Sequence, residues 1–242
     1  MVDKQFEAKS LQLLVDVQAE LAAALKSIEG KPSEGLVSGY CYYASQHVSC
    51  AADGYIFLRK GGKVEASKHL VRTAIEAMMR IGAVATKPDL VFRIAYSEYL
   101  EEKKWAAPIP GPEGDAATKA LADNWAGFVL AYKVKYSAHP LNENKLPLRD
   151  AAAIAGMGSF YDTHYRLYCK ITHAAFRGMT GNLKAFEVED NRTMTLCALV
   201  CVEALVGLGA QAPNLVSIRT RLSDIDLMVQ KIAVRTPTGI GT

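Results

Sequence analysis

Long segments with apolar residues at helical spacing, separated by Gly and Pro, are the feature that most limits how this chain can fold. The first segment, residues 3–29, ends at Gly30, Lys31 and Pro32, which predicts a long helix with a clear end. Further segments of the same kind cover residues 33–60, 64–86, 89–105, 115–137, 148–155, 159–177, 191–211 and 214–234. No segment alternates apolar and polar residues between hairpin turns. We therefore predict an all-α fold, an antiparallel bundle of eight or nine helices.

The breaks between these segments do not divide the chain into separate domains. Three prolines in residues 106–114 predict a loop, and residues 183–190 read as a connector. A length of 242 residues can form one large domain with a substantial core. We expect a single helical domain over residues 1–235 and a disordered tail over residues 236–242.

Composition narrows the classes of function. Half of the residues are apolar and 22% are charged, and the net charge of +3 comes from Lys and Arg spread without a run. This charge pattern therefore allows RNA as a partner but does not predict it. Residues 1–10 have no apolar segment of the signal-peptide type, so we do not expect export. The longest apolar run, residues 196–208, carries Glu203 and is too short to span a bilayer. Five cysteines in apolar helical segments favour reduced thiols. We expect a cytoplasmic protein without a membrane partner.

Residues 159–177 hold the reactive side chains that are grouped most closely in the sequence. As a helix, this stretch places two lines of side chains beside each other. The first line is Asp162, Arg166, Cys169, His173 and Arg177, and the second is Tyr161, Tyr165, Tyr168 and Thr172. The other histidines, at positions 47, 69, 139 and 164, have no evident partner in the sequence.

A second charged line lies in the predicted third helix, where Arg72, Glu76 and Arg80 follow one another at steps of four. These residues can form its solvated face, with Glu76 bridging both arginines. Alternatively, the line faces a polar cleft against the central stretch, where the hydroxyl of Tyr165 or Tyr168, or His173, would satisfy it.

Arg166 and His173 lie on one face of the central helix, about 10 Å apart along its axis. Side chains of this length can converge on one phosphodiester, with Arg binding the phosphate and His exchanging protons. Such a spacing also arises by chance, and Asp162 offers Arg166 a plain surface partner.

Metal and cofactor sites are not expected. Cys169 with His173, and Cys197 with Cys201, are each one helical turn apart and would give four zinc ligands if their helices were neighbours. Cysteines in so apolar a setting are more often core residues. The sequence contains no phosphate-binding glycine loop, dinucleotide fingerprint or serine-hydrolase elbow, so no small-molecule cofactor is predicted.

Two segments, HLVRTAIEAMMRIGAV (69–84) and YRLYCKITHAAF (165–176), resemble a widespread bacterial family of uncharacterised helical proteins. In that family one helix carries Arg-x-x-x-Glu and a later one Tyr-x-x-Tyr-Ser-x-x-x-His. The resemblance covers residues 65–180, implies no known activity, and has Cys169 in the place of the serine. It singles out Arg72, Glu76, Tyr165, Tyr168 and His173.

A weaker resemblance is to HEPN-type domains, many of which are metal-independent ribonucleases of toxin and phage-defence systems. It is carried by Arg166 and His173, with Leu167 where that class usually has a polar residue, and it implies a site formed across a dimer.

Two hypotheses on function follow. In the first, Arg72, Glu76, Tyr165 and His173 form an internal polar network, and the protein is an interaction or oligomerisation module, with a homodimer as one form. In the second, the protein cleaves RNA without a metal: His173 is the acid or base, Arg166 binds the phosphate, and the other three residues orient them.

Overall fold

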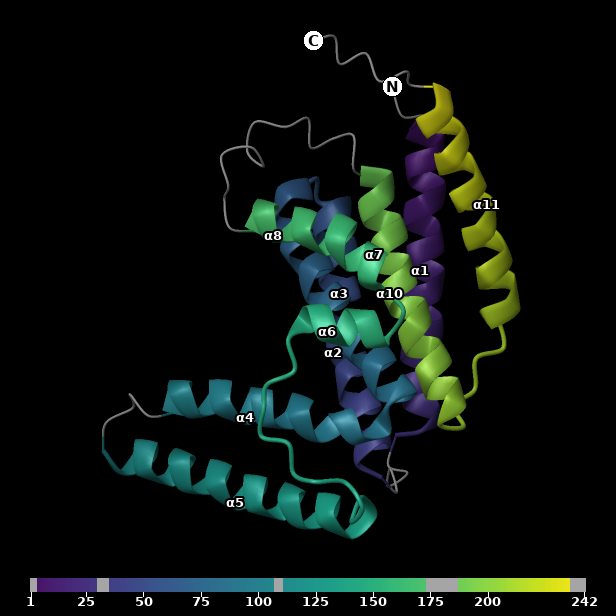
Figure 1. The fold of residues 1–242 in the computed structure, drawn as a ribbon. Helices are drawn as coiled ribbons and strands as arrows, with labels where there is room; N and C mark the ends of the chain where they lie inside the picture. The colour runs from purple at the N-terminus through teal and green to yellow at the C-terminus, as the bar shows by residue number, and fades with distance from the viewer. Residues whose placement is uncertain (1–3, 30–34, 107–110, 173–186, 236–242) are drawn as a thin grey trace. The chain divides into compact units, whose positions relative to one another are not determined.

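The computed structural model describes residues 4–29, 35–106, 111–172 and 187–235. Within these ranges the chain forms helices and no strand, which confirms the all-α prediction (Figure 1). None of these helices is both long and apolar enough to cross a membrane. The elements are α1 (Lys4–Ser27), α2 (Leu36–Lys60), α3 (Val64–Thr86), η1 (Pro88–Leu90), α4 (Val91–Ala106), α5 (Pro112–Lys135), α6 (Leu148–Ile154), α7 (Gly158–Phe160), η2 (Tyr161–Tyr165), α8 (Arg166–Thr172), α10 (Glu187–Gly207) and α11 (Leu215–Arg235).

Helix ends follow the local signals of the sequence. After α2, Gly62 adopts a φ of 71°, and the backbone N–H of Lys63 donates to the carbonyl of Leu58, which ends the helix as glycine termini commonly do. Helix α3 ends two residues before Pro88, since Lys87 is extended. Two predictions need correction. Residues 187–190 are the first turn of α10 and no part of a connector, and residues 161–165 form a π-helix within the predicted central helix.

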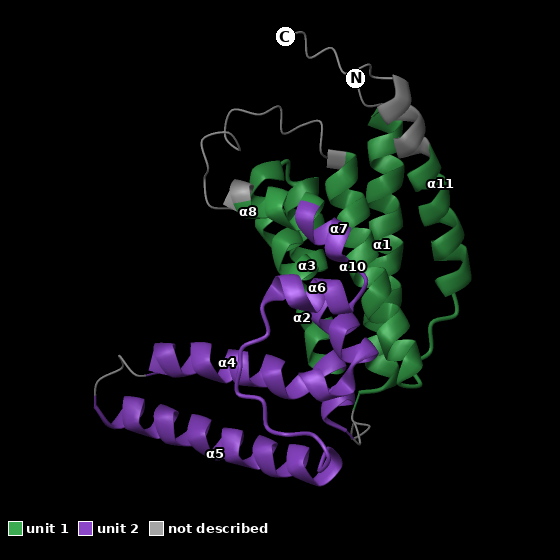
Figure 2. Ribbon diagram, viewed as in Figure 1, with its two compact units in different colours: residues 1–31, 42–78, 163–242 green, residues 32–41, 79–162 purple. Residues whose placement is uncertain are grey.

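The contacts of the chain divide it into two compact units, shown in green and purple in Figure 2. Unit 1 contains residues 1–31, 42–78 and 163–242, and unit 2 contains residues 32–41 and 79–162. Helices α2 and α3 each contribute residues to both units. The single domain expected from the sequence stays a prediction.

Unit 1 is built on α1, whose buried side contains Leu14, Val17 and Leu21. Figure 1 shows α10 and α11 beside it. Helix α10 runs parallel to α1, because contacts join Ser10 to Asn191 near their starts and Ser27 to Gln211 near their ends. Helices α2 and α11 run antiparallel to α1, as their ion pairs and hydrogen bonds show: Glu7 with Arg59, Gln18 with Ser49, Asp16 with Arg221, and Glu20 with Asn214.

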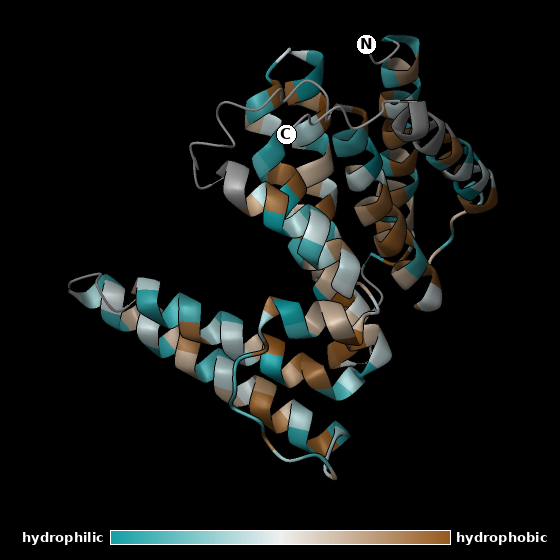
Figure 3. Ribbon diagram, turned by 45° about the horizontal axis from the view of Figure 1, so that its top comes forward, coloured by the Kyte–Doolittle hydropathy of each residue, from teal (hydrophilic) through white to brown (hydrophobic). Residues whose placement is uncertain are grey.

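Unit 2 is organised by the hairpin of α4 and α5, whose contact surface is aromatic. The ring of Phe92 lies 4.8 Å from that of Tyr132 and 5.4 Å from that of Trp125, measured between centroids. Aromatic pairs at such distances add to the stabilisation from buried area. Figure 3 shows apolar residues, in brown, interspersed with polar ones along both helices of this hairpin.

Candidate functional site

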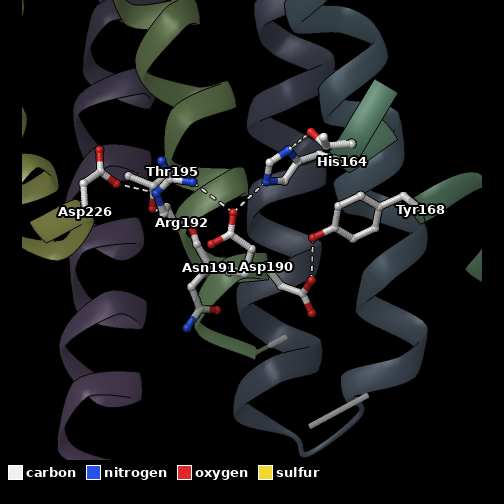
Figure 4. A network of polar contacts seen from close by, with 9 residues as sticks. His164, Tyr168, Asp190, Asn191, Arg192, Thr195 and Asp226 are labelled. Atoms are coloured by element: carbon white, nitrogen blue, oxygen red, sulfur yellow. Dashed lines mark hydrogen bonds and ion pairs between the residues drawn. The ribbon is translucent and has the colours of Figure 1, made fainter. Parts of the chain in front are cut away.

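The polar network of unit 1 is centred on the start of α10, where Glu189, Asp190, Asn191 and Arg192 follow one another (Figure 4). Successive helical residues point about 100° apart, so four in a row face all sides of a helix. Asp190 and Asn191 are buried and the other two are half-buried. Polar groups in such surroundings must be bonded to remain stable, and here each one bonds to a different part of unit 1.

Asp190 forms the most deeply buried branch. Its carboxylate accepts a hydrogen bond of 2.5 Å from the hydroxyl of Tyr168 on α8. Its other oxygen lies 4.0 Å from Nζ of Lys68 on α3, and the side chains of Asp190 and Lys68 are 1% and 0% exposed.

Burial raises the pKa of Asp190 to about 6, although the hydrogen bond from Tyr168 and the positive charge of Lys68 act in the opposite direction. The loss of hydration therefore outweighs the attraction of Lys68, as is common for buried ion pairs. Burial, together with the nearby charge of Asp190, also raises the pKa of Tyr168 well above its usual range.

Asn191 links α10 to α1 and α2. Its amide oxygen accepts a hydrogen bond of 2.7 Å from the hydroxyl of Tyr55, and its amide nitrogen donates to Oγ of Ser10 at 2.9 Å. Arg59, one turn after Tyr55 on α2, forms an ion pair of 2.8 Å with Glu7 on α1. These contacts fix the register of the three helices relative to one another.

His164 begins a chain of contacts that ends on α11. Its Nε2 lies 2.8 Å from Oε1 of Glu189, and its Nδ1 lies 2.8 Å from the hydroxyl of Thr163. Glu189 also accepts a hydrogen bond of 2.9 Å from Arg192, whose Nε donates to Asp226. Burial alone would raise the pKa of Glu189, but the hydrogen bond from His164 and the charge of Arg192 outweigh it, so this pKa lies below its usual range.

Three of the predicted site residues meet in unit 1. Glu76 accepts a hydrogen bond of 2.8 Å from the hydroxyl of Tyr165 and one of 3.0 Å from Nε of Arg72. The guanidinium carbon of Arg72 lies 5.9 Å from the centre of the Tyr165 ring. The predicted polar contact between residues 64–86 and the central stretch is therefore present. Glu76 does not bridge two arginines, because Arg80 pairs with Glu98 at 3.4 Å.

The other two predicted site residues are not brought together by the described structure. Arg166 is exposed at the start of α8, whereas Tyr165 and Tyr168 beside it are buried. His173 lies outside the described residues. A π-helix has one more residue per turn than an α-helix, so residues 161–165 break the regular steps on which the predicted line from Asp162 onwards depends.

Metal ligands do not gather in the part of the chain that the structure describes, where no group of three or more His, Cys, Asp or Glu could hold an ion. Cys197 and Cys201 are buried on α10. Burial raises the pKa of Cys197 well above its usual range, which keeps it a neutral core thiol. The zinc alternative also requires His173, which lies outside the described residues.

Sequence reasoning missed the residues at the centre of the network: Lys68, His164, Glu189, Asp190 and Asn191. The charged partner of His164 is Glu189, which is 25 residues away, so the pair could not be recognised from nearby sequence. One feature of the sequence could have indicated these residues: four polar residues in succession, Glu189–Arg192, stand at the start of a very apolar helix. A helix surrounded by apolar neighbours cannot leave such a run without partners.

Comparison with known proteins gives one positive result. No curated protein and no solved structure matches the chain. A family model matches residues 46–192, more than half of the chain, and the matched region ends at Arg192, within the polar network. This confirms the resemblance to an uncharacterised family: the chain belongs to the family of unknown function DUF5677.

Proposed function

We propose that this protein is a helical interaction module that works as a homodimer in the cytoplasm. The observation that carries the proposal is that Glu189, Asp190, Asn191 and Arg192 each bond to a neighbouring helix. The hydrogen bonds and ion pairs of these four residues hold the helices of unit 1 in one register. Cys41, Cys50 and Cys197 are free thiols, which supports a reducing compartment.

Apolar side chains on the outside of the same unit supply a surface for binding. Tyr43 and Phe57 on α2 are 65% and 78% exposed, although residues of these types are usually covered in a folded protein. A rigid frame that presents such side chains loses little conformational entropy when it binds, which favours association.

Sedimentation velocity of the purified chain, from low micromolar to hundreds of micromolar, tests this proposal. We expect the mass to rise towards that of two chains as the concentration increases. A mass of one chain at every concentration would overturn the proposal of a homodimer.

The exposure of Arg166 favours a second candidate function, cleavage of RNA of the kind expected for HEPN-type domains. Arg166 would bind a phosphate while His173 removes the proton of the ribose 2′-hydroxyl. The freed oxygen would attack phosphorus, and the bond to the 5′ oxygen would break as that oxygen gains a proton. Tyr165, the residue before Arg166, and Glu76 on α3, which accepts a hydrogen bond from the Tyr165 hydroxyl, would support Arg166.

An RNA-cleavage assay in EDTA separates the two candidates. Arg166→Ala and His173→Ala are compared with wild type and with Arg149→Ala, which removes another exposed arginine, on α6. Loss of cleavage in the first two variants alone would support the enzyme. Equal cleavage by all four proteins, or none by wild type, would rule it out.

A further inference from the structure

A hydroxyl, an imidazole and a carboxylate form a continuous line of hydrogen bonds in the polar network of unit 1. Oγ1 of Thr163 lies 2.8 Å from Nδ1 of His164, and Nε2 of the same ring lies 2.8 Å from Oε1 of Glu189. Figure 4 shows the ring of His164 with a dashed line at each of its nitrogens. A nucleophile, a base and a group that orients the base follow one another in this order in enzymes with a catalytic triad.

The charge on Glu189 sets the direction of both hydrogen bonds. Although burial raises the pKa of Glu189, the hydrogen bond from His164 and the charge of Arg192 lower it below its usual range, so this carboxylate is ionised at neutral pH. An ionised carboxylate only accepts hydrogen bonds, so Nε2 of a neutral imidazole must donate to it, which leaves Nδ1 as the acceptor. The hydroxyl of Thr163 then donates to Nδ1, which is how a base is placed to take the proton of a nucleophile.

Exposure changes along the line in the order that a reactive site requires. Thr163 is exposed, so a substrate in solution can reach its hydroxyl. The side chains of His164 and Glu189 are only 28% and 24% exposed. Partial removal from water strengthens the interaction between the ring and the carboxylate, and so favours the ring that has gained a proton. The nucleophile is therefore accessible, whereas the groups that activate it are partly shielded.

Contacts with other elements hold the three groups in place. Nη1 of Arg192 donates to Oε1 of Glu189 at 2.9 Å, and Nε of Arg192 donates to Asp226 on α11. Thr163 and His164 belong to the π-helix of residues 161–165, and single π-helical turns occur frequently at functional sites. A base whose orienting group is itself fixed loses little free energy to rearrangement during a reaction.

From this geometry we infer that Thr163 is a nucleophile that accepts the acyl group of an activated ester of a small carboxylic acid, with His164 as its base. Oγ1 of Thr163 attacks the carbonyl carbon while its proton passes to Nδ1 of His164. The bond from that carbon to the leaving oxygen breaks, and the leaving oxygen takes the proton. Water then hydrolyses the acyl-threonine by the same path, and the proton returns to Oγ1. The methyl group of threonine crowds its hydroxyl, which limits the acyl group to a small one.

Reaction with p-nitrophenyl acetate tests the inference. Samples are quenched with acid at successive times, and peptide mass spectrometry locates the acetyl group. Thr73 is a control within the same chain, because it is exposed and its hydroxyl donates to the backbone carbonyl of His69. We expect acetylation of Thr163 to be roughly 100-fold faster than that of Thr73, the smallest factor that a positioned base usually contributes.

Substitutions separate the nucleophile from the base. Thr163→Ser keeps the hydroxyl and should be acetylated at least as fast as wild type, whereas Thr163→Val has a similar shape and no nucleophile. His164→Gln should slow acetylation of Thr163 by roughly 100-fold. Circular dichroism checks that each variant is folded. The inference is overturned if Thr163 reacts no faster than Thr73 while wild type and Thr163→Val release p-nitrophenolate at the same rate. Acetylation of Thr163 that is equally fast in His164→Gln would also overturn it.

Glu189 acts through His164 as a positioning residue, and nitrogen-15 NMR of the His164 ring tests this role separately from stability. In wild type we expect the neutral ring to carry its proton on Nε2. Glu189→Ala removes the acceptor of that proton, so the ring should populate both tautomers and acetylation of Thr163 should slow. Glu189→Gln keeps an oxygen that can accept and should retain the wild-type tautomer. A proton on Nδ1 in wild type would overturn the inference, because Nδ1 could then not accept from Thr163.

Discussion

Ionisation of the buried Asp190 carboxyl destabilises the folded state. The size of this effect can be measured from the dependence of the free energy of unfolding on pH. The pKa of Asp190 rises from an ordinary 3.8 to about 6 on folding, because burial outweighs the hydrogen bond from Tyr168 and the charge of Lys68. At about 1.4 kcal/mol per pKa unit, the difference is worth about 3 kcal/mol. Since the folded pKa is the higher one, this stability is fully present below about pH 4 and is lost as the pH rises through about 6.

The perturbation is Asp190→Asn, which removes the titrating group and keeps an oxygen that can accept from Tyr168. Urea unfolding of both proteins gives the free energy of unfolding at several values of pH. We expect the wild-type value minus the variant value to fall by about 3 kcal/mol between about pH 3 and pH 7. Other groups that titrate equally in both proteins cancel in this difference.

Glu189→Gln is the matched control, because its carboxylate is adjacent and its pKa is shifted in the opposite direction. The pKa of Glu189 lies below its usual range, so its contribution to stability is present above the unfolded pKa and lost as the pH falls. For this variant the same difference should rise with pH. A flat or rising difference for Asp190→Asn would refute the reasoning, since it would mean that the attraction of Lys68 outweighs the effect of burial.

Four further predictions concern stability and are checked by denaturant unfolding. Tyr165→Phe removes the hydroxyl that donates to Glu76 and should lower the free energy of unfolding by about 1 kcal/mol; no change would show that water replaces this bond. Asn191→Ala removes the amide partner of two buried hydroxyls, those of Tyr55 and Ser10, and should lower the free energy of unfolding by about 3 kcal/mol. A loss smaller than that of Tyr165→Phe would contradict the central place of Asn191 in the network. Gly127→Ala, in open space on α5, should stabilise by about 1 kcal/mol through helix propensity. Gly82→Ala should instead destabilise by about 1 kcal/mol or more, because its new Cβ would lie 2.9 Å from a neighbouring Cβ, and stabilisation at both positions would show that α3 can shift to make room.

The helices could be predicted from the sequence because their signals are local. Gly61 and Gly62 end α2, and Pro88 limits α3, within a residue or two of the expected positions. The π-helix at residues 161–165 was missed, since one additional residue in a turn hardly changes the pattern of apolar positions.

Only those site residues that belong to a recognisable sequence motif could be predicted. Arg72, Glu76 and Tyr165 do meet, and the motif links segments about 90 residues apart. The sequence predicts a connector at the start of α10, because Glu189 and its neighbours are polar and propensity assigns polar runs to loops. Their burial depends on helices that fold against them from elsewhere in the chain, which local sequence does not reveal.

The parallel pairing of α1 with α10 has a consequence for how the protein is made. Helix α1 leaves the ribosome before its partner α10, which begins at residue 187, so more than 150 residues must be synthesised between them. Contacts so distant in sequence form late, because a long loop must close first. During that interval Leu14, Val17 and Leu21 lack one of their covering helices. A nascent chain in this state is prone to aggregate or to bind chaperones until α10 emerges.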